Sequence, residues 1–542
     1  MSAPDPSSLP IPGTLVLVDI DGRASGAHAG KTSDVILHPT PSSDANDPLN
    51  WSTARKQVAF GMLMVYCITA GFAACSIYSV LVPLSDATGI ALGDLNAGTG
   101  YMFLLLGWGG ILTQPFAQTF GKRPTFIISQ LGHLAIIVWQ GYINGPGDWY
   151  ANKIIQGFLT SPIEMLVEIS ISDLFFAHER GFYMGLYSMA LFGGNFLAPV
   201  WAGFVNDALG YRWVFWISAI QLAAGTLVLI LFMEETNYNR GTTEISENHG
   251  DAASTSSNSE EKSSDKDAPA LTTTHDVTAS DERQLTGTPY GFVRRMAMFN
   301  DRWTTMKVFY TQMYRPILFL RYPVVFWSGV LYGSSLIWYN VLNATASLIF
   351  TDVYHFRASM VGLTYLGPTL GAVLAAGYAG YAADKFLLWD ARRKHGVREP
   401  EDRLWLLGLN ALILPVGLIL WGVGAAKHIH WFGLVVGGCL TAFTSASGGA
   451  FALNYVLDSY KDLGGEVVLS VILVRNTMSF AVSYGITPWV VNMGYQNSFI
   501  VAALVGMVVY LSFLPVIKWG KGWRKASRAS YWAYVRSSVM GH

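Results

Sequence analysis

The chain has 542 residues, of which 51% are hydrophobic and only 13% are charged. A typical soluble domain is about 45–50% apolar and about 25% charged, so this composition excludes an ordinary soluble protein. Apolar runs of about 20 residues recur along most of the chain, and about 20 residues are needed to cross ~30 Å of hydrocarbon. The composition therefore predicts an all-α membrane protein. The net charge of -1 decides nothing, because in such a protein the distribution of charge matters more than its sum.

The first half of the chain opens with a polar segment and continues with six apolar runs. Residues 1–56 are rich in Pro, Ser, Asp and Gly and are predicted to form a disordered cytosolic tail. The runs that could span a membrane cover residues 57–84, 97–118, 124–143, 151–173, 183–205 and 213–233. We expect these runs to form an N-terminal six-helix bundle over residues 57–235.

A linker and six further runs follow. Residues 236–318 are expected to form a cytosolic linker, in which the Ser/Thr-rich, acidic part is flexible and Pro289 to Arg315 form a basic amphipathic helix on the membrane surface. The further runs cover residues 322–350, 359–383, 403–425, 432–457, 467–491 and 496–517. They predict a C-terminal six-helix bundle over residues 319–518, before a cytosolic tail over residues 519–542. The expected fold has twelve transmembrane helices in two pseudo-symmetric bundles.

Lys and Arg residues are distributed unevenly between the two ends of these runs. If both termini are cytosolic, the basic residues at outer helix ends are Lys153, Arg212, Arg357 and Lys427. The opposite orientation would place the basic loops at residues 122–123 and 392–394, and both tails, outside the cell. Since positive residues accumulate on the cytosolic side, we expect a multi-pass plasma-membrane protein with both termini in the cytosol.

The second run of each half ends in a related motif. The residues concerned are Gly121, Lys122 and Arg123 in QTFGKRP, and Gly380, Asp384 and Lys385 in GYAADK. Both motifs resemble the cytosolic signature of the major facilitator superfamily, and the resemblance extends from Trp51 to about residue 520. It implies the major facilitator fold and a latch that holds one conformational state, to which Asp173 and Arg180 are also assigned. Gln118 replaces the acidic residue of the first copy, so the second latch is expected to be better preserved.

The fifth run carries small residues and a proline at fixed spacing. They are Gly185, Gly194, Ala198, Pro199, Ala202 and Gly203. This series resembles the antiporter signature of the same superfamily, with Ala in place of two glycines, and the resemblance points to proton antiport. Small residues on one helix face also permit close packing, so a simple packing seam remains an alternative.

Several longer segments resemble one subgroup of the superfamily. They are DPLNWS (47–52), GFLTSPIEMLVEISISDLFFAHERG (157–181), EETNYNR (234–240), VLNATASLIF (341–350) and the region around FALNYVLDSY (451–460). These segments are similar to the fungal drug:proton antiporter-like subgroup, whose members include efflux pumps encoded beside secondary-metabolite pathways and uptake systems for polyamines and cations. The resemblance therefore indicates a class of transporter and leaves its cargo open.

Two acidic residues lie deep inside the fourth run. Glu164 and Glu168 are four residues apart, so they share one face of a helix, roughly 18 and 24 Å from its outer end. An ionised carboxylate at such depth costs several kcal/mol unless it is paired, hydrated or protonated. We expect one of the two to carry a coupled proton. The alternative is a structural anchor, for example one paired with Lys153.

Arg475 is the basic residue that lies within a predicted span. The family resemblance implies that its helix and the helix of Glu168 and Asp173 belong to opposite halves, so it could meet either acid across a central cavity, or bind an anionic substrate. A structural ion pair with Asp458 or Glu466 near the cytosolic end is a further alternative.

Aromatic and amide side chains are expected to line the same cavity with Arg475. The candidates are Tyr66, Trp338, Tyr339, Asn340, Asn343, Asn454 and Tyr455. Such residues provide apolar walls and uncharged hydrogen-bonding groups for a small molecule. Interfacial aromatic belts or core packing could explain any one of them.

Together these features predict a proton-coupled secondary transporter of small organic molecules, driven by the proton gradient without a cofactor. We expect a monomeric efflux antiporter for a drug or secondary metabolite in a fungal membrane. Polyamine or cation uptake by the same fold is an alternative, and a transporter-like nutrient sensor is a more distant one. Scattered histidines predict no metal site, and AGKT at residues 29–32 lacks the first Gly of a nucleotide-binding loop. No enzyme activity and no nucleic-acid partner are expected.

Overall fold

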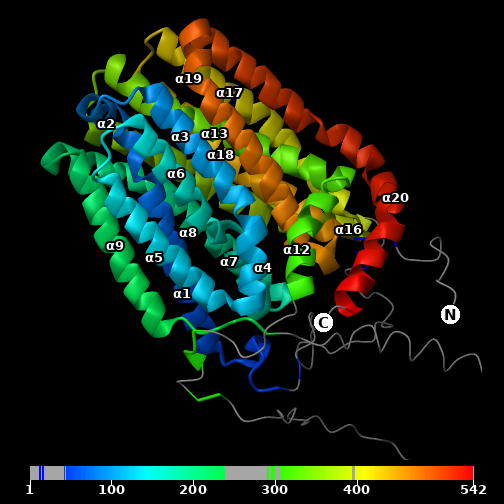
Figure 1. Ribbon diagram of the computed structural model, residues 1–542. Coiled ribbons are helices and arrows are strands. Elements are labelled where there is room, and N and C mark those ends of the chain that lie inside the picture. The colour runs from blue at the N-terminus through cyan, green and yellow to red at the C-terminus, as the bar shows by residue number, and fades with distance from the viewer. Residues whose placement is uncertain are drawn as a thin grey trace, which may run out of the picture.

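Long helices account for nearly all of the regular structure in the computed structural model (Figure 1). The structure describes residues 11–13, 15–16, 42, 44–238, 290–291, 295–298, 306–393 and 397–540. The only strands among these residues are β1 (Leu15–Val16) and β2 (Val397–Arg398), which pair antiparallel. The described part of the chain is therefore all-helical apart from one two-residue ladder.

The N-terminal half begins at a short 3-10 turn, Pro48–Asn50, and ends at Phe232. Its α-helices are α1 (Thr53–Cys75), α2 (Leu81–Thr88), α3 (Leu92–Trp108), α4 (Gly110–Phe120), α5 (Lys122–Gln140), α6 (Pro146–Thr160), α7 (Pro162–Leu174), α8 (Ala177–Leu209) and α9 (Tyr211–Phe232). The break between α6 and α7 falls at Pro162, which has no backbone N–H to donate to the preceding turn. The two helices nevertheless form one continuous candidate span, Pro146–Leu174.

The C-terminal half begins with a helix bent sharply against the next one. Its α-helices are α12 (Met306–Phe319), α13 (Pro323–Asp352), α14 (Ala358–Thr364), α15 (Leu366–Gly377), α16 (Ala383–Arg393), α17 (Leu407–Ala426), α18 (Trp431–Ser459), α19 (Gly464–Leu511) and α20 (Phe513–Met540). A π-helical turn, η3 (Tyr378–Ala382), joins α15 to α16, and a 3-10 segment, η4 (Pro400–Leu406), precedes α17.

The described helices are consistent with the predicted number of spans. Eight segments are long and apolar enough to cross a membrane, or ten when each bent pair is counted as one span. The 19-residue α5 is long enough to supply an eleventh, although it begins with Lys122 and Arg123 and is less apolar than the ten. Gly494 has φ 73° and divides α19 into two helices, which brings the number to twelve. The all-α, major facilitator-type architecture expected from the sequence is confirmed.

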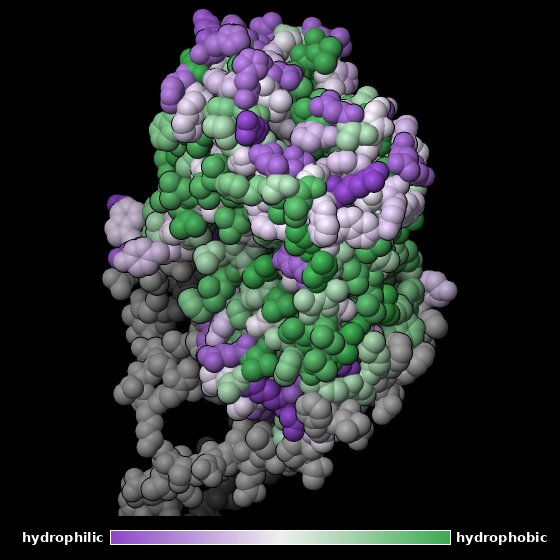
Figure 2. Space-filling view, turned by 90° about the vertical axis from the view of Figure 1, so that its left-hand side faces the viewer, coloured by the Kyte–Doolittle hydropathy of each residue, from purple (hydrophilic) through white to green (hydrophobic). Residues whose placement is uncertain are grey.

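The two ends of the bundle differ in which parts of the chain they hold. In Figure 1, α1 begins and α20 ends at the lower end, whereas α2 lies at the upper end. We refer to these as the lower and upper ends. Figure 2 shows apolar side chains across the middle of one face, with hydrophilic side chains gathered above and below them. Such a band is the surface that a bilayer requires.

Two predictions about polar segments are wrong for residues that the structure describes. Residues 44–52 lie in the predicted disordered tail, yet the Asp47 carboxylate accepts a 3.0 Å hydrogen bond from Leu49 N and caps the turn Pro48–Asn50. The Tyr238 hydroxyl donates to Asp44 at 3.1 Å, which ties this turn to the end of the N-terminal half. Residues 296–298 of the predicted amphipathic helix are not helical, whereas its part from Met306 to Arg315 lies in α12, and residues 299–305 lie outside the described residues. Most of the predicted linker, residues 239–289, lies outside the described residues.

Candidate functional site

A cavity of about 120 Å³ lies between the two halves of the chain. The N-terminal half lines it with α1, α3, α6, α7 and α8, and the C-terminal half lines it with α13 and α19. Its polar and aromatic lining residues are Tyr78, Phe103, Thr160, Glu164, Phe192, Asn195, Phe196, Tyr332, Tyr339, Asn340, Asn343, Arg475, Asn476 and Ser479. Both halves therefore contribute directly to one chamber.

An ion pair between Glu164 of α7 and Arg475 of α19 joins the two halves inside this cavity. Asn476 donates a 3.0 Å hydrogen bond to Glu164 Oε2, and Arg475 donates one of 3.0 Å to the Tyr332 hydroxyl. The Arg475 and Glu164 side chains are only 4% and 13% exposed. Because little water screens the two charges, their attraction is stronger than that of a surface pair.

The partner of Arg475 differs from those that the sequence suggested. Glu168 and Asp173 were expected across the cavity, and Asp458 or Glu466 as structural partners. In the structure Asp173 pairs with Lys122, Asp458 lies 3.6 Å from Arg403, and Glu466 lies 3.1 Å from Arg315. Glu164 and Glu168 share one face of α7, so which of them meets Arg475 depends on how far along α7 the guanidinium lies, and the sequence does not give that depth.

Glu168 lies one helical turn below Glu164 on α7. Its Oε2 atom is buried and has no hydrogen-bond partner among the described residues. An ionised carboxylate is expensive to bury without a donor. The proposed pairing of these acids with Lys153 is wrong, because Lys153 donates to Gln156 Oε1 at 2.8 Å and lies 4.6 Å from the centroid of the Trp149 ring.

One face of α13 carries the aromatic and amide residues of the cavity wall. Tyr339, Asn340 and Asn343 line the cavity as predicted, and Tyr332 extends the same face by two turns toward the lower end. The Tyr339 ring also packs edge-to-face on Phe196 of α8, with centroids 4.8 Å apart. Tyr332 was missed, although counting back seven and eleven residues from Tyr339 and Asn343 leads to it.

Four predicted cavity residues are not among those that line it. Tyr66 is fully buried in the N-terminal half, with its hydroxyl 2.7 Å from Ser129. Trp338 donates to Ser334 at 3.2 Å and lies within the C-terminal half. Tyr455 lies at the lower end, where it donates to Glu401 at 3.4 Å, and its neighbour Asn454 does not line the cavity either. The helix faces of these residues, rather than their chemical types, account for the error.

The small residues of α8 form a seam at the upper end of the bundle. A Cβ atom at Gly203 would overlap the Ala358 carbonyl of α14, so the two backbones touch only because position 203 is glycine. Pro199 faces Gly362 of α14, and Ala202 packs against Ala358. Gly194 packs on Ile68 of α1, Ala198 is fully buried, and Gly185 has open space around it. Pro199, Ala202 and Gly203 thus bring the two halves together above the cavity, whereas Gly185 and Gly194 make no contact with the other half.

A carboxylate caps the loop between α4 and α5 at the lower end. Glu235 accepts hydrogen bonds of 3.1 Å from the backbone N–H groups of both Lys122 and Arg123, at the start of α5. Gly121 has φ 117°, and a Cβ there would come within 2.5 Å of Glu235. Burial raises the pKa of Glu235, while the three backbone N–H groups that bond to it oppose this rise. EETNYNR, a segment of the family resemblance, therefore closes this loop.

The other predicted latch residues of the first half lie around this cap. Lys122 forms a buried ion pair with Asp173 at the end of α7. Arg123 donates to the Ile230 carbonyl at 2.9 Å and to the Met296 carbonyl. Arg180 donates to the Ser172 carbonyl at 2.9 Å. All these contacts lie within the N-terminal half or bind it to the segment at residue 296.

The corresponding loop of the C-terminal half is more open. Gly380 lies in the π-helical turn η3 and has open space around it. Lys385 is exposed and lies 4.3 Å from the centroid of the Tyr381 ring. The side chain of Asp384 lies outside the described residues. The motif that matches the signature better is thus the one with the more exposed setting.

A different cluster holds the lower end of the C-terminal half. Arg524 of α20 is fully buried and donates to both carboxylate oxygens of Glu401, at 2.8 and 2.6 Å. Its remaining terminal nitrogen donates to the Pro12 carbonyl at 2.7 Å. Gly13, with φ 86°, packs directly on the backbone of Ser459, so a stretch of the N-terminal tail is held against the C-terminal half.

Within the described residues, no group of three or more His, Cys, Asp or Glu side chains is arranged to hold a metal ion. The charged groups that line the cavity are the Glu164 carboxylate and the Arg475 guanidinium, and the buried Glu168 carboxylate lies one turn away on α7. They can hold a proton, an organic ion or each other.

Sequence comparison shows the family to which this chain belongs. Residues 58–394 match the profile of the Major Facilitator Superfamily. Protein HOL1 of Saccharomyces cerevisiae is 29% identical over 94% of both chains. An uncharacterized MFS-type transporter of Schizosaccharomyces pombe, C1271.10c, is 26% identical over 97% of this chain and 94% of its own. The MFS transporter fsa7 of a Fusarium species is 25% identical over 87% of this chain and 85% of its own.

Solved structures have the same fold. The proton:xylose symporter XylE superposes with a TM-score of 0.57 at 14% identity, covering 86% of this chain and 97% of its own. The human organic anion transporter MFSD10 gives a TM-score of 0.53 at 14% identity, covering 84% of this chain and 99% of its own. The family match, the two six-helix halves and the shared central cavity agree. The chain belongs to the Major Facilitator Superfamily and is a multi-pass membrane transporter, not an enzyme.

Proposed function

We propose that this chain is a proton-coupled efflux antiporter that exports a small organic molecule from a fungal cell by alternating access. The Glu164–Arg475 ion pair carries the proposal, because it links the two halves through a group that a proton can neutralise. Protonation of Glu164 removes its charge, and Arg475 then loses its main partner. Proton binding and the contact between the halves are therefore thermodynamically coupled.

Glu168 completes the proposed pathway. Its buried, unpartnered oxygen lies one turn closer to the lower end than Glu164. Two carboxylates four residues apart on a helix face can exchange a proton through the cavity or through a water molecule. In this proposal Glu168 takes up or releases the proton when the lower end opens.

The cavity lining favours an organic cargo with aromatic or aliphatic parts. Phe192 and Phe196 of α8 face Tyr332 and Tyr339 of α13 across the chamber. The amide side chains of Asn195, Asn340 and Asn343 provide uncharged hydrogen-bond donors and acceptors. Apolar walls with a few polar groups are typical of small-molecule sites.

The proposed setting is the plasma membrane, with the lower end in the cytosol and a monomer as the working unit. The basic residues at the lower end support this orientation, since Lys122, Arg123, Arg295, Lys521 and Arg524 all lie there. Positive side chains accumulate on the cytosolic face of membrane proteins.

The test is transport by purified protein in proteoliposomes under an imposed pH gradient. The cargo panel contains hydrophobic drugs, weak organic acids and polyamines. Glu164→Gln and Glu168→Gln keep the size of each side chain and remove its ability to ionise. We expect gradient-driven flux to fall by about tenfold or more in at least one of them, which corresponds to ~1.4 kcal/mol or more of lost coupling.

Glu179→Gln is the matched control, because Glu179 is an exposed acid at the start of α8. Exchange of labelled for unlabelled cargo without a gradient should persist in the Gln variants, since exchange needs no net proton movement. Gradient-driven flux that is unchanged in both variants would remove the proton assignment. Wild-type flux that does not depend on the pH gradient would contradict the proposed antiport mechanism.

A cation importer of the same fold is a second candidate, and the charge of the cavity region favours it. Glu164 and Glu168 supply two carboxylates on one helix face, whereas Arg475 supplies one guanidinium. The Tyr332 and Tyr339 rings could also face an ammonium group, as aromatic rings do in cation sites. Spermidine that accumulates inside vesicles, and that competes with the cargo more strongly than an organic anion does, would favour the importer over the exporter.

A further inference from the structure

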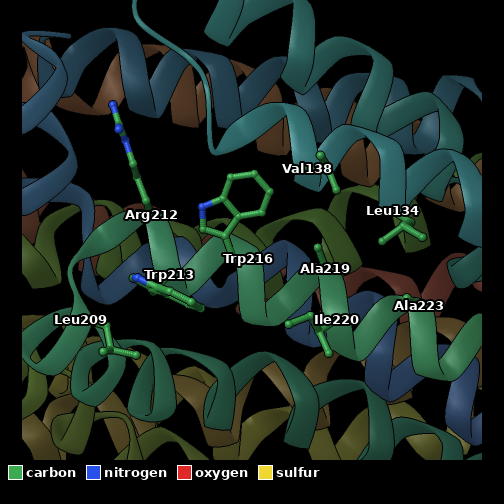
Figure 3. A pocket seen from close by; sticks show the side chains of 9 residues that line it. All are labelled: Leu134, Val138, Leu209, Arg212, Trp213, Trp216, Ala219, Ile220 and Ala223. Atoms are coloured by element: carbon green, nitrogen blue, oxygen red, sulfur yellow. The ribbon is translucent and has the colours of Figure 1, made fainter.

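A second hollow lies on the outside of the bundle, far from the central cavity. It is a groove of about 710 Å³ between α5 and α9. Figure 3 shows Arg212 at one end of the groove, Leu134 and Ala223 at the other, and Trp216 between them. Leu134 and Val138 form the α5 wall, and Ala219 and Ala223 leave space on the α9 side.

The length of the groove matches one leaflet of a bilayer. Arg212 and Ala223 are separated by eleven residues of continuous helix, or about 16 Å at the rise of an α-helix. Half of a hydrocarbon core is about 15 Å. The groove therefore runs from the upper surface of the membrane to about its middle.

The charged end of the groove has the chemistry of a headgroup site. Arg212 is exposed, and its Nε donates to the Tyr211 hydroxyl at 3.2 Å. No carboxylate pairs with it among the residues that the structure describes. Trp213 and Trp216 lie beside it at the level where indole rings settle at the lipid–water boundary. A guanidinium in this position can bind a phosphate with two parallel hydrogen bonds.

The position of Trp216 is fixed by its neighbours in the turn that follows α5. The Tyr142 ring meets it edge-to-face at 5.1 Å, and a Cβ atom at Gly141 would contact the indole at 3.4 Å. The indole is thus a rigid wall of the groove. A lipid chain can lie against it without having to reorganise the side chain.

We propose that this groove binds one phospholipid of the upper leaflet. Its phosphate contacts Arg212, and one acyl chain runs past Trp216 and over Ala219 as far as Ala223. Charge complementarity selects a lipid over a second copy of this chain. A symmetric dimer through the groove would bring the unpaired Arg212 of each copy to the same interface.

The experiment is native mass spectrometry of the full-length, delipidated protein titrated with phosphatidylglycerol of a single acyl length. Arg212→Gln removes the charge, and Ala223→Phe fills the lower part of the groove at an exposed position. We expect wild type to retain one saturable lipid, and each variant to bind it about tenfold more weakly, a loss of ~1.4 kcal/mol. Arg212→Lys should retain part of the binding, because lysine keeps the positive charge but cannot donate two parallel hydrogen bonds to the phosphate.

Lys427→Gln and Val416→Phe are the matched controls, since both residues are exposed on the other half of the molecule. They should bind the lipid as wild type does, and all variants should remain monodisperse. Equal binding by wild type, Arg212→Gln and Ala223→Phe would overturn the proposal. So would efficient disulfide cross-linking of two copies through Ile220→Cys in the groove, because the occupant would then be a second chain.

Discussion

The lower ends of the two halves are held in different ways, although the sequence gives them related motifs. In the N-terminal half the loop between α4 and α5 is fastened by Glu235 and by the Lys122–Asp173 pair. In the C-terminal half Gly380 has open space around it, and the buried Arg524–Glu401 pair lies in the cluster that anchors η4 and α20.

The comparison shows that a loop can match the family motif well without being held by buried contacts, and can be held by buried contacts although its motif matches poorly. Gln118 replaces the expected acid in the first motif, and its backbone carbonyl accepts a 3.0 Å hydrogen bond from Asn237. The segment after α9 therefore closes this loop, in a copy of the motif that lacks the acidic residue. The predictions below test this division, from the largest expected effect to the smallest.

The largest effect should come from Arg524→Met. Removing this fully buried guanidinium leaves the Glu401 carboxylate buried without its partner, which costs about 3–5 kcal/mol. We expect a matching loss in the free energy of unfolding in detergent micelles. Lys521→Met is the control, because its pair with Glu399 is largely exposed and is worth ~1 kcal/mol or less. Equal destabilisation by the two variants would contradict a buried anchor at Arg524.

The two motif lysines give a direct comparison of the halves. Lys122→Met should lower the stability by about 2 kcal/mol, between the values for fully buried and exposed pairs, because Lys122 is buried and its partner Asp173 is 21% exposed. Lys385→Met should cost ~0.5–1 kcal/mol at most, since it loses only an exposed contact with the Tyr381 ring. Thermal unfolding of both proteins in one detergent measures the difference. The reverse order would mean that the second motif is the stronger latch.

The smallest effect within the N-terminal half should come from Glu235→Ala. It removes the acceptor for two N–H groups at the start of α5, and losing such a cap costs about 1 kcal/mol. Glu235→Gln keeps one acceptor oxygen and should cost less. Protection of the Lys122 and Arg123 amides from hydrogen exchange gives a local readout. Unchanged protection in Glu235→Ala would show that another group closes the loop.

Hydropathy alone was enough to predict the number of spans, because each span must bury about 20 residues in lipid whatever its neighbours are, and the motif resemblance added the major facilitator fold. The breaks within spans were harder to predict. The run at 57–84 is divided at Ser76–Ser79 into α1 and α2, and the run at 97–118 is bent after Trp108. The hydropathy of a whole apolar run does not show where the helix within it bends.

The site was only partly predictable, for a geometrical reason. Trp338 and Tyr339 are adjacent on α13, yet one packs inside the C-terminal half and the other lines the cavity. Successive residues of a helix point about 100° apart. The residue types therefore indicate which helix lines the cavity, but the packing of the helices decides which of its faces is turned toward the cavity. Glu164 and Glu168 were identified because buried acids are rare, and that signal does not depend on the rotation of the helix.

Gly494 has a consequence for how the C-terminal half can move. This residue, with φ 73°, turns the chain between the two arms of α19 without an intervening loop. One arm carries Arg475, and the other packs its Gly506 against Leu414 of α17 and Trp338 of α13. A hinge of a single residue cannot let one arm slide while the other stays fixed. A displacement of Arg475 toward or away from Glu164 would therefore be transmitted through Gly494 to the arm that packs on α17 and α13.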